Sequence, residues 1–217
     1  MGDASDPRLG VGGQIHTVLR QLYKAYEHDD PPPERVKPIP FQLLEWVVRR
    51  LQSSTYSQLI ADLLIIGYFF LLRPGEYCYK AGKENTPFRL QDVSLEVGDD
   101  TLNAATVDTA QIPSATQVTL RFTNQKNGER DEDITHGASD DDLLCPLKAV
   151  GRRVRYLREH NAPPETPLCT YYTPNGNSRN VSSTPLTTAL RKGTAADELQ
   201  YLNFSESDVS ARALRAG

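Results

Sequence analysis

Residues 59–72 read LIADLLIIGYFFLL, and this run decides how the rest of the chain has to fold. Apolar side chains occupy nearly every position, so a helix formed here is apolar on all faces and other elements must surround it. The alternative is a membrane span. However, the run has 14 residues and contains Asp62, whereas about 20 apolar residues are needed to cross a bilayer. We therefore predict a buried central helix and no transmembrane segment.

Composition limits the classes of protein to consider. A chain of 217 residues, 38% of them hydrophobic, can bury a core. Its net charge of -4 gives no overall field that attracts nucleic acid, so any anion site has to be local. The three cysteines are odd in number and far apart, which fits neither a disulfide framework nor paired zinc ligands. Because the sequence also lacks a signal peptide and metal or nucleotide motifs, we expect an intracellular protein that uses no metal or cofactor.

Outside the central run, periodicity and turn residues predict a mainly α fold with a small antiparallel β-sheet (α+β). Further helices are predicted at residues 15–26, 41–51, 146–160 and 185–199, with a last one beginning near Asp208. Strands are predicted at 88–95, 118–123 and 129–134, the last two joined by a hairpin turn at Asn127-Gly128. The acidic third strand is expected at an exposed edge of the sheet.

The N-terminal part is predicted to be separate from the main domain. Residues 29–40, DDPPPERVKPIP, contain five prolines, which exclude a helix interior and favour an extended linker. Residues 1–28 then form a flexible tail with one amphipathic helix, and residues 41–217 form the main domain.

Arg73 and Lys126 are the first two candidate site residues. Arg73 follows the central run, and Pro74 disfavours helical geometry at Arg73, so its guanidinium emerges where the core meets irregular chain. Its partner is either Glu76, three residues on, or a bound anion that matches the fork of donors on arginine. Lys126 precedes the Asn-Gly turn at a hairpin tip, where it is either solvated or directed at a ligand.

Arg212 and Arg215 stand three apart in ARALRAG (211–217), on one face of the expected last helix. Two cations near a helix N-terminus are mutually unfavourable unless an anion lies between them or nearby carboxylates pair with them. The helix at 146–160 is also basic. Its basic residues form either a surface that binds a DNA backbone or a solvated face beside three aspartates. They are Lys148, Arg152, Arg153 and Arg155. His136, just beyond the acidic strand, can approach the base of the Lys126 hairpin, although a lone histidine is more often a satisfied polar residue.

Taken together, LRPGE (72–76), Lys126 on a hairpin and LRAG (214–217) resemble the tyrosine recombinase (phage integrase) family in order and spacing. The residues of these motifs are most similar to those of the eukaryotic branch carried by Crypton-like mobile elements. The resemblance covers residues 37–217 and implies a catalytic domain, with residues 15–26 as the end of a preceding helical core-binding domain.

The resemblance implies DNA strand exchange through a 3′-phosphotyrosine, on double-stranded DNA, in a tetramer, without metal, and in the nucleus of a eukaryote. Arg73, Arg212 and Arg215 would bind the scissile phosphate, and Lys126 would protonate the departing 5′ oxygen. Arg212 stands where the family has a histidine and cannot act as a base near neutral pH. The family's nucleophilic tyrosine lies some tens of residues beyond the second arginine, so we expect a truncated chain that is inactive alone. A DNA-binding module without catalysis and a helical interaction protein remain as alternatives.

Overall fold

The computed structural model describes residues 37–81, 87–122 and 132–216. The chain divides into two compact units, Met1–Arg35 and Val36–Gly217, and every described residue belongs to the second. The helix expected at 15–26, most of the proline-rich linker and Lys126 with its Asn-Gly turn therefore lie outside the described residues.

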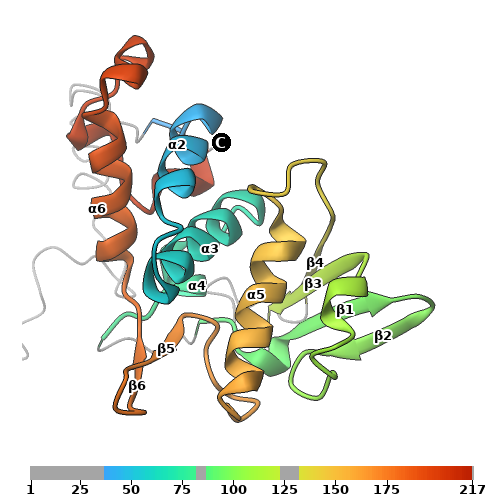
Figure 1. The fold of residues 1–217 in the computed structure, drawn as a ribbon. Helices are drawn as coiled ribbons and strands as arrows, with labels where there is room; N and C mark the ends of the chain where they lie inside the picture. Colours follow the sequence, from blue (N-terminus) through green and yellow to red (C-terminus); the bar gives the residue numbers. More distant parts are fainter. Residues whose placement is uncertain (1–36, 82–86, 123–131, 217) are drawn as a thin grey trace, which may run out of the picture. The chain divides into compact units, whose positions relative to one another are not determined.

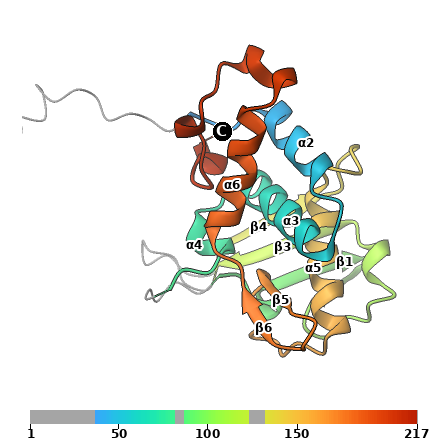
Figure 2. The same ribbon diagram turned by 60° about the vertical axis from the view of Figure 1, so that its left-hand side comes forward.

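The central element is the helix α3 (Thr55–Phe69), as the run LIADLLIIGYFFLL predicts. Its residues 59–67 are all buried, and Ser54 caps its N-terminus by accepting a hydrogen bond from the Ser57 amide at 3.1 Å. Three more helices pack around the core in the order of the chain: α2 (Phe41–Arg50), α5 (Pro146–Glu159) and α6 (Ser183–Thr194). Figure 1 shows α5 between α3 and the larger sheet, with α2 and α6 on the other side of α3, and Figure 2 shows α2 and α6 side by side.

The chain reverses sharply where α3 ends. Leu71 adopts a left-handed φ of 51°, and the Leu72 amide reaches back to the Gly67 carbonyl at 3.1 Å. The short helix α4 (Pro74–Tyr77) follows at once. This reversal fixes where Arg73 leaves the core.

The larger sheet is antiparallel, with strand order β2-β1-β3-β4. Its strands are β1 (Val93–Val97), β2 (Asp100–Asn103), β3 (Gln117–Phe122) and β4 (Glu132–Gly137). Along β3 and β4, Leu120 pairs with Ile134 and Val118 with His136, which places these four side chains on the same face. A second hairpin pairs β5 (Thr170–Tyr172) with β6 (Ser178–Asn180). The predicted α+β class is therefore confirmed, as is the edge position of the acidic strand.

Several predicted boundaries differ from the structure. The first strand begins at Val93, because Leu90–Asp92 forms a 3₁₀ turn, and β2, β5 and β6 were not predicted. Helix α6 ends at Thr194, short of residue 199. None of the helices in the described ranges is long and apolar enough to cross a membrane.

The α-helix expected from Asp208 is wrong. Two 3₁₀ turns, Glu206–Asp208 and Ala213–Ala216, flank an irregular stretch instead. The Ala211 amide donates to the Thr187 hydroxyl at 3.1 Å, and its carbonyl accepts a hydrogen bond from the Tyr77 hydroxyl at 3.2 Å. Side chains from distant elements thus satisfy backbone groups that an α-helix would pair within itself.

Candidate functional site

A hollow of about 410 Å³ lies where the end of α3, the α4 turn, the ends of β3 and β4, and the last 3₁₀ turn meet. We call it the Arg73–Arg215 hollow. Its charged and titratable lining residues are Arg73, Glu76, Glu132, His136 and Arg215, and its apolar lining residues are Phe69, Phe70, Leu71, Phe122 and Ile134. Two of the predicted site arginines, far apart in the sequence, thus share one hollow.

The turn around α4 holds Arg73 in place. Its backbone is extended, with φ -72° and ψ 145°, as expected for a residue before proline. The Arg73 amide donates to Glu76 Oε2 at 2.6 Å, so Glu76 caps the turn. The Arg73 side chain approaches this carboxylate less closely, with 3.7 Å between Nη1 and Oε1.

The chain contains a second turn of the same spacing, which shows what a closed arginine–carboxylate pair looks like here. Arg89 donates to Asp92 through Nε at 3.0 Å and through Nη2 at 3.1 Å. This bidentate pair raises the pKa of Arg89, chiefly through the side-chain hydrogen bond to Asp92. At 3.7 Å the Arg73–Glu76 contact is too long for a hydrogen bond. Glu76 therefore serves mainly as a backbone cap, and most donors of Arg73 remain free of Glu76.

Arg215 projects from a firmly packed segment. Ala213 and Leu214 are fully buried, and their 3₁₀ turn contacts α3. Arg215 itself is exposed at the hollow and forms no ion pair with any residue the structure describes. The buried backbone thus fixes the position of the Arg215 guanidinium, which has no carboxylate partner among the described residues.

The ends of β3 and β4 form the opposite side of the hollow. Phe122 and Glu132, which flank the undescribed residues 123–131, both line it. Lys126 belongs to that segment, so its own position lies outside the described residues. His136 also lines the hollow and meets the Phe70 ring edge-on, with 4.6 Å between ring centroids.

The sequence motifs do not include His136, although its place just beyond the acidic strand allows it to approach the base of the Lys126 hairpin. The signal for it was the alternation along β4, since a residue two positions from Ile134 shares its face. No tyrosine is among the described residues that line the hollow.

Arg212 does not join Arg215, which contradicts the expectation that both lie on one helical face. Arg212 lines a separate hollow of about 840 Å³. The expected α-helix does not form here, because Thr187 and Tyr77 bind the backbone of Ala211 and the chain continues as the 3₁₀ turn Ala213–Ala216.

The basic helix α5 is less available to DNA than its sequence indicates. Arg153 is only 2% exposed and donates from Nε to the Leu168 carbonyl at 3.0 Å, so the expected surface position of Arg153 is wrong. Arg152 forms an ion pair with the buried Asp62 of α3, with 2.6 Å between Nη2 and Oδ1. Both arginines therefore stabilise the fold by binding groups in or near the core.

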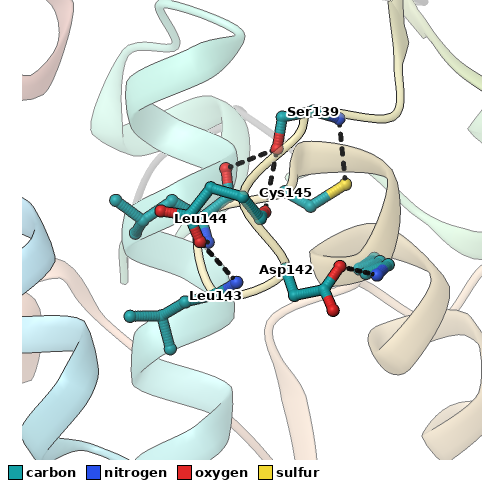
Figure 3. A network of polar contacts seen from close by, with 7 residues as sticks. Ser139, Asp142, Leu143, Leu144 and Cys145 are labelled. Carbon is teal, nitrogen blue, oxygen red and sulfur yellow. Dashed lines mark hydrogen bonds and ion pairs between the residues drawn. The ribbon is translucent and has the colours of Figure 1, made fainter.

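Lys148 and Arg155 remain at the surface of α5. Lys148 pairs with Asp142, in the loop of polar contacts that Figure 3 shows between Ser139 and Cys145. In that loop the Asp141 carboxylate accepts a hydrogen bond from the Leu143 amide at 2.7 Å. Arg155 is exposed. Of the four predicted DNA contacts, Arg155 is thus the residue best placed to meet a phosphate.

The three cysteines and the other possible metal ligands of the described residues are dispersed or buried. No group of three or more His, Cys, Asp or Glu residues there could hold a metal ion. Cys78, Cys145 and Cys169 are all buried and free. Burial raises the pKa of Cys169 to about 11, which keeps its thiol protonated near neutral pH.

The fold and the site together define an α+β protein with an arginine-lined hollow at the end of its central helix. In comparisons with known proteins, no family model and no curated protein matches the sequence.

Proposed function

We propose that this chain binds duplex DNA and that the Arg73–Arg215 hollow holds the scissile phosphate of a tyrosine-recombinase-type strand transfer. One observation carries the proposal: Arg73 and Arg215, far apart in the sequence, line one hollow beside the strand ends that flank the Lys126 segment. Guanidinium forks bind phosphate and carboxylate groups through pairs of parallel hydrogen bonds, so a phosphate is a suitable ligand for two arginines.

The chemistry assigned to the hollow is phosphoryl transfer. A tyrosine oxygen bonds to phosphorus, the 5′ oxygen of the next nucleotide leaves, and that oxygen takes up a proton. Arg73 and Arg215 would bind the nonbridging oxygens, where negative charge develops in the transition state. By resemblance, Lys126 would supply the proton. A histidine ring carries a nitrogen that can accept a proton, whereas a guanidinium has only donors, so His136 is a better candidate than Arg212 for accepting the proton of the tyrosine.

The attacking tyrosine has to come from outside the described lining of the hollow, for example from a second copy of the chain. The same observation favours a second candidate, a DNA-binding module that does not cleave. The third reading, an interaction protein whose arginines only form ion pairs, fits the Arg73–Glu76 contact less well because of its 3.7 Å length.

Duplex binding by the full chain tests the proposal. Fluorescence anisotropy with a labelled duplex across a salt series should show affinity that falls steeply as salt rises. Arg73→Ala should weaken binding about tenfold or more and leave the melting temperature unchanged, because Arg73 contacts a ligand. Arg49→Ala is the matched control. It removes an exposed arginine that pairs with Glu45 on α2, outside the hollow.

Absence of duplex binding at low salt contradicts the proposal. So does an Arg73→Ala variant that loses stability while it keeps its DNA affinity. A nicked suicide duplex then separates the two DNA functions, because a covalent protein–DNA adduct on a denaturing gel indicates cleavage. Salt-dependent binding without an adduct favours the non-cleaving module.

A further inference from the structure

The second hollow, which Arg212 lines, has a composition of its own. We call it the Arg212 hollow. It lies between the α4 turn, the start of α6 and the stretch before the last 3₁₀ turn, and has a volume of about 840 Å³. Its polar side chains are Tyr79, Lys80, Ser182, Ser183, Thr184, Thr187, Ser210 and Arg212.

The charge of this lining is of one sign. No aspartate or glutamate is among the described residues that line the Arg212 hollow, whereas Glu76 and Glu132 line the neighbouring one. Hydroxyl groups donate hydrogen bonds to phosphate oxygens, and a guanidinium adds charge. The lining therefore suits an anion with several oxygens.

Arg212 is held ready for such a ligand. Its neighbour Ala211 is 2% exposed and is fixed at both polar backbone groups, by Thr187 through the amide and by Tyr77 through the carbonyl. The next residue, Ala213, is fully buried. Arg212 itself is exposed and forms no ion pair with a residue in the described ranges. A fixed backbone carrying a free guanidinium lowers the ordering cost of binding.

The start of α6 adds to this arrangement. The Ser182 side chain does not cap the 12-residue helix, and no acidic residue stands in its first turn. The first amides of α6 therefore have no side-chain acceptor from the cap position, and Ser182 and Ser183, at this end of the helix, line the hollow.

The two hollows are neighbours, because the α4 turn and the segment 210–215 each contribute residues to both of them. Arg73 and Glu76 line one, and Pro74 and Gly75 line the other. Arg212 and Arg215 are three residues apart, so their Cα atoms are separated by at most about 11 Å. A DNA strand carries a phosphate about every 3.4 Å along the helix axis, so one duplex can occupy both hollows.

We infer that the Arg212 hollow binds a second phosphate of the same DNA backbone whose scissile phosphate lies in the Arg73–Arg215 hollow. The inference rests on the proposed function for the source of the phosphate. It gives Arg212 a role in binding and register that is separate from the proton transfer done by the family's histidine.

Two measurements on the full chain test this inference. In the first, inorganic phosphate is added to ¹⁵N-labelled protein, and the amide signals of Ser183 and Arg212 should shift. In the second, Arg212→Ala should lower the slope of log affinity for a duplex against log salt by about 1, because one phosphate contact is lost. Ser183→Glu should abolish the phosphate-induced shifts and should lower the slope as Arg212→Ala does. It should not lower the melting temperature, since a carboxylate in the first turn of a helix is favourable. Thr188→Glu places the same charge on α6 outside the hollow and should retain the phosphate-induced shifts.

Each other outcome overturns the inference in a recognisable way. Duplex binding with an unchanged slope for Arg212→Ala and unmoved amide signals leaves the proposed function intact and removes the second phosphate. Shifts with inorganic phosphate but an unchanged slope mark a site for free phosphate instead of DNA. If the duplex does not bind at all, the proposed function itself fails, and the response to inorganic phosphate shows whether the hollow binds anions.

Discussion

At the scale of single residues, Arg152 shows how burial changes the meaning of a basic side chain. Its sequence context indicated a DNA contact, but its guanidinium reaches Asp62, whose side chain is 2% exposed on the central helix. Gln58 donates a second hydrogen bond to the same carboxylate oxygen at 3.0 Å. Burial raises the pKa of Asp62, and the charge of Arg152 opposes that rise.

Arg152→Ala is therefore expected to destabilise the protein by about 2 kcal/mol, less than for a fully buried pair because Arg152 is partly exposed. The loss should grow with pH. Without Arg152 the pKa of Asp62 rises further, and a carboxyl group with a raised pKa favours the folded state at low pH and loses that contribution as it ionises. The free energy of unfolding in urea should thus fall more steeply above about pH 4 than in the wild type.

Arg155→Ala is the matched control for this prediction, since Arg155 is exposed on the same helix. It should leave stability nearly unchanged at every pH. An Arg152→Ala variant that keeps its stability but loses duplex affinity contradicts the structural role and restores the interpretation of Arg152 as a DNA contact.

At the scale of elements, the contact between α3 and α4 connects the core to both hollows. A Cβ atom added at Gly67 of α3 would lie 2.7 Å from Cζ of the Tyr77 ring, closer than atoms can approach. Tyr77 is 1% exposed and donates to the Ala211 carbonyl. Gly67 thus makes room for the side chain that anchors the segment carrying Arg212 and Arg215.

Gly67→Ala should lower the free energy of unfolding by about 1–2 kcal/mol, because the strain of overpacking exceeds the helix propensity gained. It should also weaken duplex binding, since a displaced Tyr77 ring releases Ala211. Thr188→Ala, on the exposed face of α6, gains helix propensity alone and serves as the control. Urea unfolding and anisotropy measure the two effects, and unchanged values for both would show that Tyr77 does not position the segment.

The elements that the sequence predicted well are those whose own periodicity determines them. Helices α2, α3 and α5 and strand β3 follow from apolar spacing within each segment. The stretch around Ala211 did not follow, because Thr187 and Tyr77 satisfy its backbone from distant parts of the chain. The small hairpin β5–β6 had a local signal that was missed, the Asn175-Gly176 turn, with Gly176 at a φ of 78°.

The candidate site was predictable to a similar degree. The motifs identified Arg73 and Arg215, which the structure brings into one hollow. They did not identify His136, whose position depends on the register of β4, nor the separation of Arg212 from Arg215. Side chains whose direction depends on strand register or on tertiary hydrogen bonds cannot be placed from sequence spacing alone.

At the scale of the whole molecule, the buried helix α3 unites the two arginines. Its end leads through the Leu71 reversal to Arg73, and its side packs against the turn that carries Arg215. Phosphate binding in the hollow would therefore depend on two segments that are far apart in the sequence meeting at one helix. If the two arginines share one phosphate, their contributions to the free energy of DNA binding should be coupled.

A double-mutant cycle measures that coupling. Arg73→Ala and Arg215→Ala should each weaken duplex binding, and the double variant should weaken it by less than the sum, with a coupling of about 1 kcal/mol. The reason is that one arginine alone no longer holds the phosphate in the geometry that lets the other bind well. A cycle between Arg73 and the distant Arg155 should instead be additive within about 0.5 kcal/mol. If the Arg73–Arg215 cycle is equally additive, the two arginines contact different phosphates, and the hollow does not hold one group between them.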